Sequence, residues 1–72
     1  MKKITLKTEY ITLGQLLKFI SVIQSGGEAK IWLQLNEVLV NGNLETRRGR
    51  KLYPDDWVMI ESERYVMVKD ET

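Results

Sequence analysis

The chain of 72 residues has no cysteine and no histidine, and it has a single proline. The absence of cysteine excludes a disulfide framework, a thiol nucleophile and an iron–sulfur cluster, and the absence of both residues excludes the usual structural zinc sites. Histidine is also the side chain most often used as a general base near neutral pH. The sequence therefore favours a protein without catalytic residues, a metal site or a cofactor.

The sequence also lacks a long apolar stretch. A helix that spans a bilayer needs about 20 consecutive apolar residues. A secretory signal needs an apolar segment of roughly 7–15 residues, and the amino-terminal segment Met1 to Lys7 does not contain one. These observations predict a cytoplasmic protein that does not enter a membrane.

The composition is that of a folded chain, with 43% hydrophobic and 29% charged residues. A chain of this length is large enough for one small core and too small for a substrate domain beside a cofactor domain. We find no linker, repeat or low-complexity segment. Residues 1–72 are therefore expected to form a single domain.

The net charge of +1 hides an uneven distribution of charge along the chain. Residues 1–29 carry a net charge of +2, residues 30–51 carry +3 and residues 52–72 carry −4. A polyanion responds to the local potential rather than to the total charge. The positive middle third keeps nucleic acid among the candidate partners, and the acidic last third is a candidate surface for a protein partner.

The first half of the sequence predicts one strand and two helices. Alternation of apolar and polar residues predicts a short strand from Lys3 to Lys7. Thr12 followed by Gln15 is a capping-box pattern, and it precedes an apolar helical repeat that ends at Ser25-Gly26-Gly27. A second helix is expected from about residue 28 to residue 36. Apolar residues cover more than half of its circumference, so we expect it to be packed between other elements.

The second half has the period of two that is typical of strands. Val38 to Val40 leads into Asn41-Gly42, a strong signal for a tight hairpin turn, with Asn43 to Thr46 as the return strand. Residues 57–60 and 65–68 predict a second hairpin. The expected order, β-α-α-β-β-β-β, is that of an α+β domain.

The densest group of cations is Arg47-Arg48-Gly49-Arg50-Lys51. Guanidinium groups bind phosphates in a bidentate manner, and a glycine between them allows close approach of the backbone. Alternatively, the segment is a solvated loop whose cations pair with Glu45 and the acidic last third. On either interpretation we expect these charges to contribute little to stability.

Several other residues are weaker candidates. Lys18 and Lys30 lie on the polar faces of the two predicted helices. Asp55-Asp56 lacks a third ligand or a base, and it is more typical of a turn. Four aromatic side chains could stack on nucleobases, although the position of Trp32 on an apolar helix face favours a core role: Trp32, Tyr53, Trp57 and Tyr65.

The order and spacing of these pieces resemble the α-L RNA-binding domain, named for the fourth protein of the small ribosomal subunit. The resemblance rests on Gly26-Gly27-Glu28-Ala29-Lys30, Val38-Leu39-Val40-Asn41-Gly42, the run from Glu45 to Leu52, and Asp56-Trp57-Val58. The GG-x-AK loop and the RRGRK run are similar to those of the small stand-alone YaaA/YbcJ-like branch. The resemblance covers residues 12–60.

The resemblance implies two short helices packed on a small, mainly antiparallel, strongly bent sheet, and RNA bound by the helices and hairpin loops. The RNA-binding residues that it implies, together with the helix lysine, are Lys18, Ser25, Gly27, Lys30, Asn41, Gly42, Arg47, Arg48, Arg50 and Lys51. Two positions depart from the wider family, which usually has Arg where this chain has Gly26 and Gly where it has Asp55. The first departure removes a phosphate contact and makes residues 47–51 more important.

The function expected from the sequence is non-catalytic binding of structured RNA, ribosomal or ribosome-associated, through backbone and shape contacts. The implied partner is a ribosomal subunit or its precursor. Two alternatives stay open. One is a protein-interaction adaptor that uses the acidic carboxyl-terminal hairpin, and the other is binding to the DNA backbone.

Overall fold

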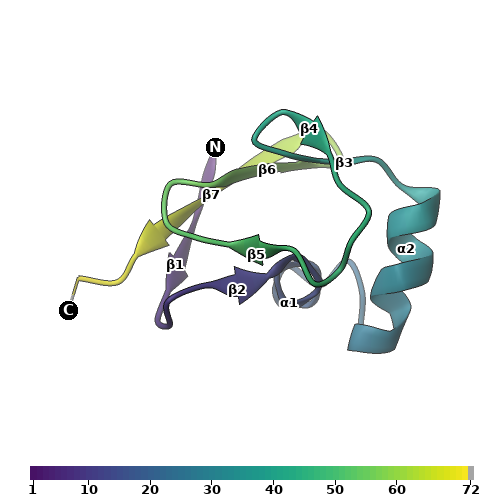
Figure 1. The fold of residues 1–72 in the computed structure, drawn as a ribbon, viewed down its shortest axis with the longest axis horizontal. Helices are drawn as coiled ribbons and strands as arrows, with labels where there is room; N and C mark the ends of the chain where they lie inside the picture. Colours follow the sequence, from purple (N-terminus) through teal and green to yellow (C-terminus); the bar gives the residue numbers. More distant parts are fainter. Residues whose placement is uncertain (72) are drawn as a thin grey trace.

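The computed structural model describes residues 1–71, which form two short helices and a mixed sheet (Figure 1). The helical segments are α1 (Leu13–Phe19), the 3-10 turn η1 (Gly26–Glu28) and α2 (Ala29–Leu35). The five-stranded sheet contains β1 (Lys2–Leu6), β3 (Val38–Val40), β4 (Asn43–Leu44), β6 (Trp57–Ile60) and β7 (Glu63–Lys69). A second sheet pairs β2 (Ile11–Thr12) with β5 (Lys51–Leu52). The α+β prediction is confirmed.

Helix α1 begins as the sequence predicts but ends earlier. The Thr12 hydroxyl accepts a hydrogen bond from the Gln15 amide (3.2 Å), and the Gln15 side chain accepts one from the Thr12 amide (2.8 Å), so the capping box is complete. The helix stops at Phe19 rather than at the glycines. Ser21 has a φ of 66°, and the amides of Ser21 and Val22 bond back to the carbonyls of Lys18 and Leu17. This is a Schellman motif that uses serine where glycine is usual.

The sequence predicts that helix α2 is packed between other elements, but in the structure it is not. Ala29 and Leu33 are buried, and Trp32 packs at the margin of the core. Ile31 and Leu35, however, are 62% and 78% exposed. In Figure 1 the helix stands at one end of the molecule, where it has the core on one side. Its wide apolar surface is therefore only partly covered by residues 1–71.

The large sheet has the order β1-β7-β6-β3-β4. The pairs β7-β6, β6-β3 and β3-β4 are antiparallel, whereas β1 pairs with β7 in parallel, with Lys2 opposite Tyr65 and Leu6 opposite Lys69. Both predicted hairpins are present, and the turn residues Asn41 and Gly42 have φ values of 52° and 87°. Strand β4 is shorter than predicted, because Glu45 turns inward after Leu44.

The core lies between the helices and the large sheet. Its fully buried side chains come from both halves of the chain: Leu13, Leu16, Leu17, Leu33, Val38, Val40, Leu52, Val58, Ile60 and Met67. Among residues 1–71 no helix is long and apolar enough to cross a bilayer.

Candidate nucleic-acid interface

The segment between β4 and β5 is organised around the buried carboxylate of Glu45. This residue is 6% exposed. Its oxygens accept hydrogen bonds from the Arg47 side chain (3.0 and 3.1 Å), the Arg50 side chain (3.1 Å) and the backbone amides of Thr46 and Arg47 (3.1 and 3.0 Å). These contacts, with the Arg47 guanidinium first, lower the pKa of Glu45 from 4.5 to about 2.

The alternative that cations of residues 47–51 pair with Glu45 is confirmed for Arg47 and Arg50. Because this carboxylate is buried, we expect these two arginines to contribute more to stability than solvated charges do. Both guanidinium groups neutralise Glu45, and the Glu45 carboxylate raises the pKa of Arg47. The side chain of Arg47 is nevertheless 73% exposed, and that of Arg50 is 34% exposed. These two arginines therefore shape the loop, while part of the Arg47 guanidinium still faces solvent.

The same loop is docked on the start of α1. The Leu13 amide donates to the Arg50 carbonyl (2.8 Å), and the Gly14 amide donates to the Arg48 carbonyl (2.9 Å). Two of the amides that lack partners inside the helix are thus satisfied by the loop. The approach is close, because a Cβ at position 14 would be in van der Waals contact with the Arg48 carbonyl oxygen (3.4 Å) and the Ala29 Cβ (3.7 Å), which leaves little room for a longer side chain.

Docking brings the Arg48 side chain to the connection between the helices. Its Nη1 donates to the Gly26 carbonyl oxygen at 3.3 Å. Lys18, Gly26, Arg48 and Gly49 line one hollow together with Thr12, Gly14 and Gln15, and none of these lining residues is acidic. We call this site the Lys18–Arg48 hollow. The wider family usually has Arg where this chain has Gly26, but the helix connection still has a cation beside it. Arg48 supplies this cation from residues 47–51, which we call the basic loop.

Among residues 1–71, neither Lys18 nor Arg48 takes part in an ion pair. A cation without an acidic partner keeps its full charge for an external anion. In this respect Lys18 and Arg48 differ from Arg47 and Arg50. The sequence run does not separate the two kinds of arginine, because the distinction depends on which side of the loop faces Glu45.

The predicted residues of the helix connection are exposed. The Ser25 hydroxyl contacts the Glu28 carboxylate (3.5 Å), which also accepts from the Gln24 amide (3.2 Å). Gly27 has open space around it, since a Cβ there would meet only the Ser25 hydroxyl at 4.0 Å. Lys30 is exposed on α2 and is not among the residues that line the Lys18–Arg48 hollow.

The Asn41-Gly42 turn has a structural role and lies elsewhere. The Asn41 amide group donates to Asp56 Oδ1 (3.0 Å), and its oxygen accepts from the Trp57 amide (3.0 Å). Asp56 Oδ2 in turn accepts from the Tyr53 amide (2.8 Å). Figure 1 shows β4 and this turn on the opposite side of the molecule from α1, so the turn is not brought to the hollow.

Lys51 lies in β5 rather than in a loop, and its Nζ is 4.9 Å from the centre of the Tyr10 ring. Tyr10 was not a candidate, because the partner of β5 is not evident from the sequence. Gln15 and Gly14 were also missed as lining residues, although the capping box does place Gln15 on the exposed arc of α1. Within residues 1–71 no cluster of acidic side chains is arranged to hold a metal ion.

Two short helices on a small mixed sheet, with a basic loop docked on the first helix, define an α-L RNA-binding domain. A family model described as the S4 domain matches residues 4–68, and the chain belongs to this family. A relative from Bacillus subtilis (strain 168), described as "Probable ribosome maturation protein RlbA", is 60% identical over 58 residues. The aligned part covers 81% of this chain and 82% of that relative. The family that the residue pattern resembles is confirmed.

Proposed function

We propose that the protein binds structured, ribosome-associated RNA without catalysing a reaction, and that the Lys18–Arg48 hollow holds phosphates of the RNA backbone. Membership of the S4 domain family supports RNA as the ligand. The printed name of the Bacillus subtilis relative supports an association with ribosome maturation. On this proposal the protein acts in the cytoplasm on a ribosomal subunit or its precursor.

The observation that carries the proposal is the pairing of two uncompensated cations across one hollow. Lys18 comes from α1 and Arg48 from the basic loop, so their separation is set by rigid elements rather than by one flexible segment. Arg48 uses one guanidinium hydrogen bond for Gly26 and keeps the others for a phosphate. Outside the hollow, positive charge comes from Lys30 on α2 and from the cluster of Glu45, Arg47 and Arg50, whose two arginines share one carboxylate and so leave a net charge of +1.

The contacts are with the backbone and shape of the RNA rather than with its base sequence. Among residues 1–71 both α-helices are short, with seven residues each, and the charged side chains that line the hollow, Lys18 and Arg48, are suited to phosphates. Such a surface recognises how phosphates are arranged in space, which distinguishes folded RNA from a DNA duplex. The sequence also predicts that the acidic carboxyl-terminal hairpin is a docking surface for a protein, and this stays a prediction.

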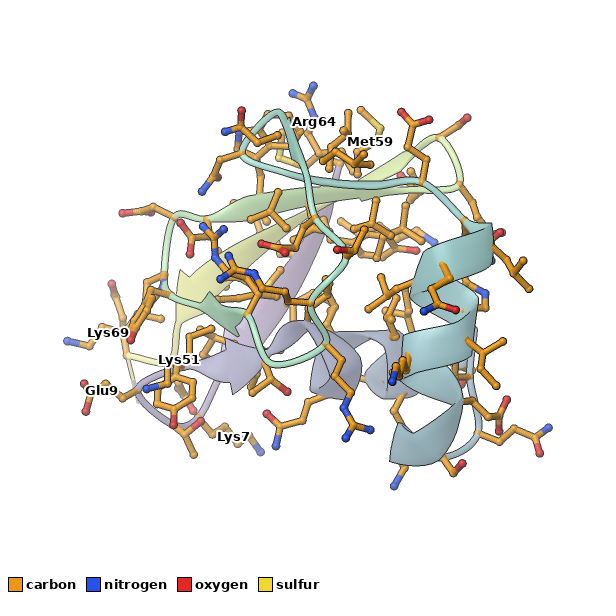
Figure 2. The ribbon with its side chains drawn as sticks, turned by 45° about the vertical axis from the view of Figure 1, so that its right-hand side comes forward. Lys7, Glu9, Lys51, Met59, Arg64 and Lys69 are labelled. Carbon is orange, nitrogen blue, oxygen red and sulfur yellow. The ribbon has the colours of Figure 1, made fainter. Side chains whose placement is uncertain are left out.

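The test is a set of binding titrations at several salt concentrations, with a structured RNA hairpin and a DNA duplex of the same length. Each lost phosphate contact should flatten the dependence of log affinity on log salt by about 0.7–0.9. We expect the slope to flatten by this amount in Arg48→Gln and by twice this amount in the Lys18→Gln, Arg48→Gln double variant. Arg64→Gln is the matched control and should leave the slope unchanged, because Arg64 does not line the hollow and lies at the top of the view in Figure 2, away from Lys51 at the lower left.

Two results would contradict the proposal. If a folded Arg48→Gln protein binds RNA with the affinity and salt slope of the wild type, the hollow is not the phosphate site. If the wild type binds the RNA and the DNA equally well, the contacts are with backbone charge alone and the shape recognition is lost.

A further inference from the structure

A pair of tyrosines lies beside the basic loop, at the end of the small sheet. The ring centres of Tyr10 and Tyr53 are 5.6 Å apart, and their planes are inclined by 49°. The Nζ of Lys51 lies 4.9 Å from the centre of the Tyr10 ring, within the range of a cation–π contact. Tyr53 is 43% exposed. Since the two rings are tilted, Tyr10 does not cover a whole face of the Tyr53 ring.

The pairing of β2 with β5 brings these residues together. Ile11 lies opposite Leu52 and Thr12 opposite Lys51, so Tyr10 and Tyr53 come next in the same ladder. The backbone of Tyr53 is fixed by the hydrogen bond from its amide to Asp56 (2.8 Å). The aromatic ring is therefore presented on a rigid element, which lowers the entropy lost when a ligand stacks on it.

We infer that the exposed ring of Tyr53 is a stacking site for an unpaired nucleobase of the RNA, with Lys51 beside it to neutralise an adjoining phosphate. The inference rests on the proposed function and narrows its ligand to a folded RNA that carries an unpaired nucleotide. Aromatic rings next to cations are the usual components of surfaces that bind single-stranded nucleic acid. A base paired inside a helix has no free face for such a contact.

The stacking site and the Lys18–Arg48 hollow lie within reach of one RNA molecule. Five residue steps separate Arg48 from Tyr53, so their Cα atoms are at most about 18 Å apart. Both ends of this segment are held, at Arg48 by α1 and at Tyr53 by Asp56. The spacing between the phosphate site and the base site is thus fixed by the protein.

Charges of both signs surround the tyrosines. In Figure 2 the labelled Lys7, Lys51 and Lys69 gather at the same end of the molecule, with Glu9 among them. Lys7 and Lys69 also line a common hollow with Glu9 and Asp70. These lysines are matched in number by Glu9, Asp70 and Asp56, which lies beside Tyr53. Lys51, next to the rings, is therefore the cation that a phosphate would contact, and the aromatic surface adds a contact that charge alone does not provide.

The test compares two RNA hairpins that differ by a single unpaired nucleotide in the stem, the bulged hairpin and its fully paired counterpart. The wild type is expected to prefer the bulged hairpin. Tyr53→Leu should lower affinity for the bulged hairpin by about 5- to 100-fold, the range expected for one stacked base, and should leave affinity for the paired hairpin unchanged. Tyr53→Phe keeps the ring and should keep the preference.

The matched control is Phe19→Leu. Phe19 is 71% exposed and lines a groove with β1 rather than the Lys18–Arg48 hollow, so loss of this ring should leave both affinities unchanged. A thermal unfolding curve for each variant checks that the domain is folded.

The outcomes separate the two proposals. Equal binding of both hairpins by the wild type, or a bulge preference that persists in Tyr53→Leu, would overturn the stacking site while leaving the phosphate site intact. An equal loss for both hairpins in Tyr53→Leu would overturn it too, because the ring would then act on the fold of the surface. Absence of binding to either hairpin by the wild type would overturn the proposed function and the stacking site together.

Discussion

The guanidinium of Arg47 holds the carboxylate of Glu45 at two points, with Nε 3.0 Å from one oxygen and Nη2 3.1 Å from the other. Glu45 and Arg47 are only two positions apart in the chain, so this contact closes a tight loop. Arg50 donates to the same carboxylate, with its Nη1 3.1 Å from Oε1. The cations of residues 47–51 thus include two, Arg47 and Arg50, that stabilise the loop through their contacts with the buried Glu45.

Removal of this support should destabilise the domain. Glu45→Ala leaves two guanidinium groups and two backbone amides without their acceptor, and we expect a loss of about 2–4 kcal/mol in the free energy of unfolding. Urea unfolding at neutral pH measures it. Glu37→Ala, which removes an exposed carboxylate, is the control and should change stability by less than about 0.5 kcal/mol. Equal stability of the two variants would contradict the assigned role of Glu45.

Stability should also depend on pH through Glu45. Its pKa is lowered from 4.5 to about 2 in the folded state, so the native protein holds this proton less tightly than the unfolded chain. The contribution, about 3 kcal/mol, is present in full above roughly pH 5 and is lost as the pH falls toward 2. Urea unfolding between pH 2.5 and pH 7 measures the effect as the difference between the wild type and Glu45→Gln. A constant difference across this range would rule out the shifted pKa.

Gly14 should be intolerant of a long side chain. In Gly14→Leu, atoms beyond Cβ have to push Arg48 away from α1, which breaks the hydrogen bond between the Gly14 amide and the Arg48 carbonyl. We expect a net loss of about 1–2 kcal/mol in stability and weaker RNA binding. The control for stability is Gly49→Leu, since a Cβ at Gly49 meets nothing within 4 Å. It is not a control for RNA binding, because Gly49 lines the Lys18–Arg48 hollow. Comparable losses of stability in the two variants would show that loop docking does not depend on close approach at position 14.

Asn41 combines a left-handed backbone with two side-chain hydrogen bonds, and two substitutions separate these contributions. Asn41→Ala loses both bonds and strains the backbone at a φ of 52°, for an expected loss of about 2–3 kcal/mol. Asn41→Gly loses the bonds without the strain and should be about 1 kcal/mol more stable than Asn41→Ala. Chemical denaturation supplies the values, with Asn43→Ala as the neighbouring control. If Ala and Gly are equivalent at position 41, the strain has no effect.

Local signals in the sequence predicted the features that depend on a few neighbouring residues. The Thr12–Gln15 capping box and the Asn41-Gly42 turn are present as expected, because each is completed within four residues. The charge of the basic run was also evident. The placement of Arg48 beside Gly26 was not, because that contact joins positions 22 apart and depends on the docking of the loop.

Features that depend on tertiary packing were missed for a common reason. The apolar character of Ile31 and Leu35 predicted burial, but no element of residues 1–71 covers that side of α2. For Glu45 the sequence offered pairing with the cations of residues 47–51 as one alternative, but it did not predict burial, which two arginines and two backbone amides make possible. In both cases periodicity or charge gave the chemical character of the side chain but not the extent to which the fold covers it.

The parallel pairing of β1 with β7 has a consequence for biosynthesis. Residues 2–6 leave the translating ribosome well before residues 63–69, which form their only partner strand among the residues described. The strand that carries the buried side chains of Ile4 and Leu6 therefore cannot pair with β7 until more than fifty further residues have been made. The large sheet is completed only after residues 63–69 have emerged, so a nascent chain that stalls before Glu63 exposes β1 as an unpaired, partly apolar strand.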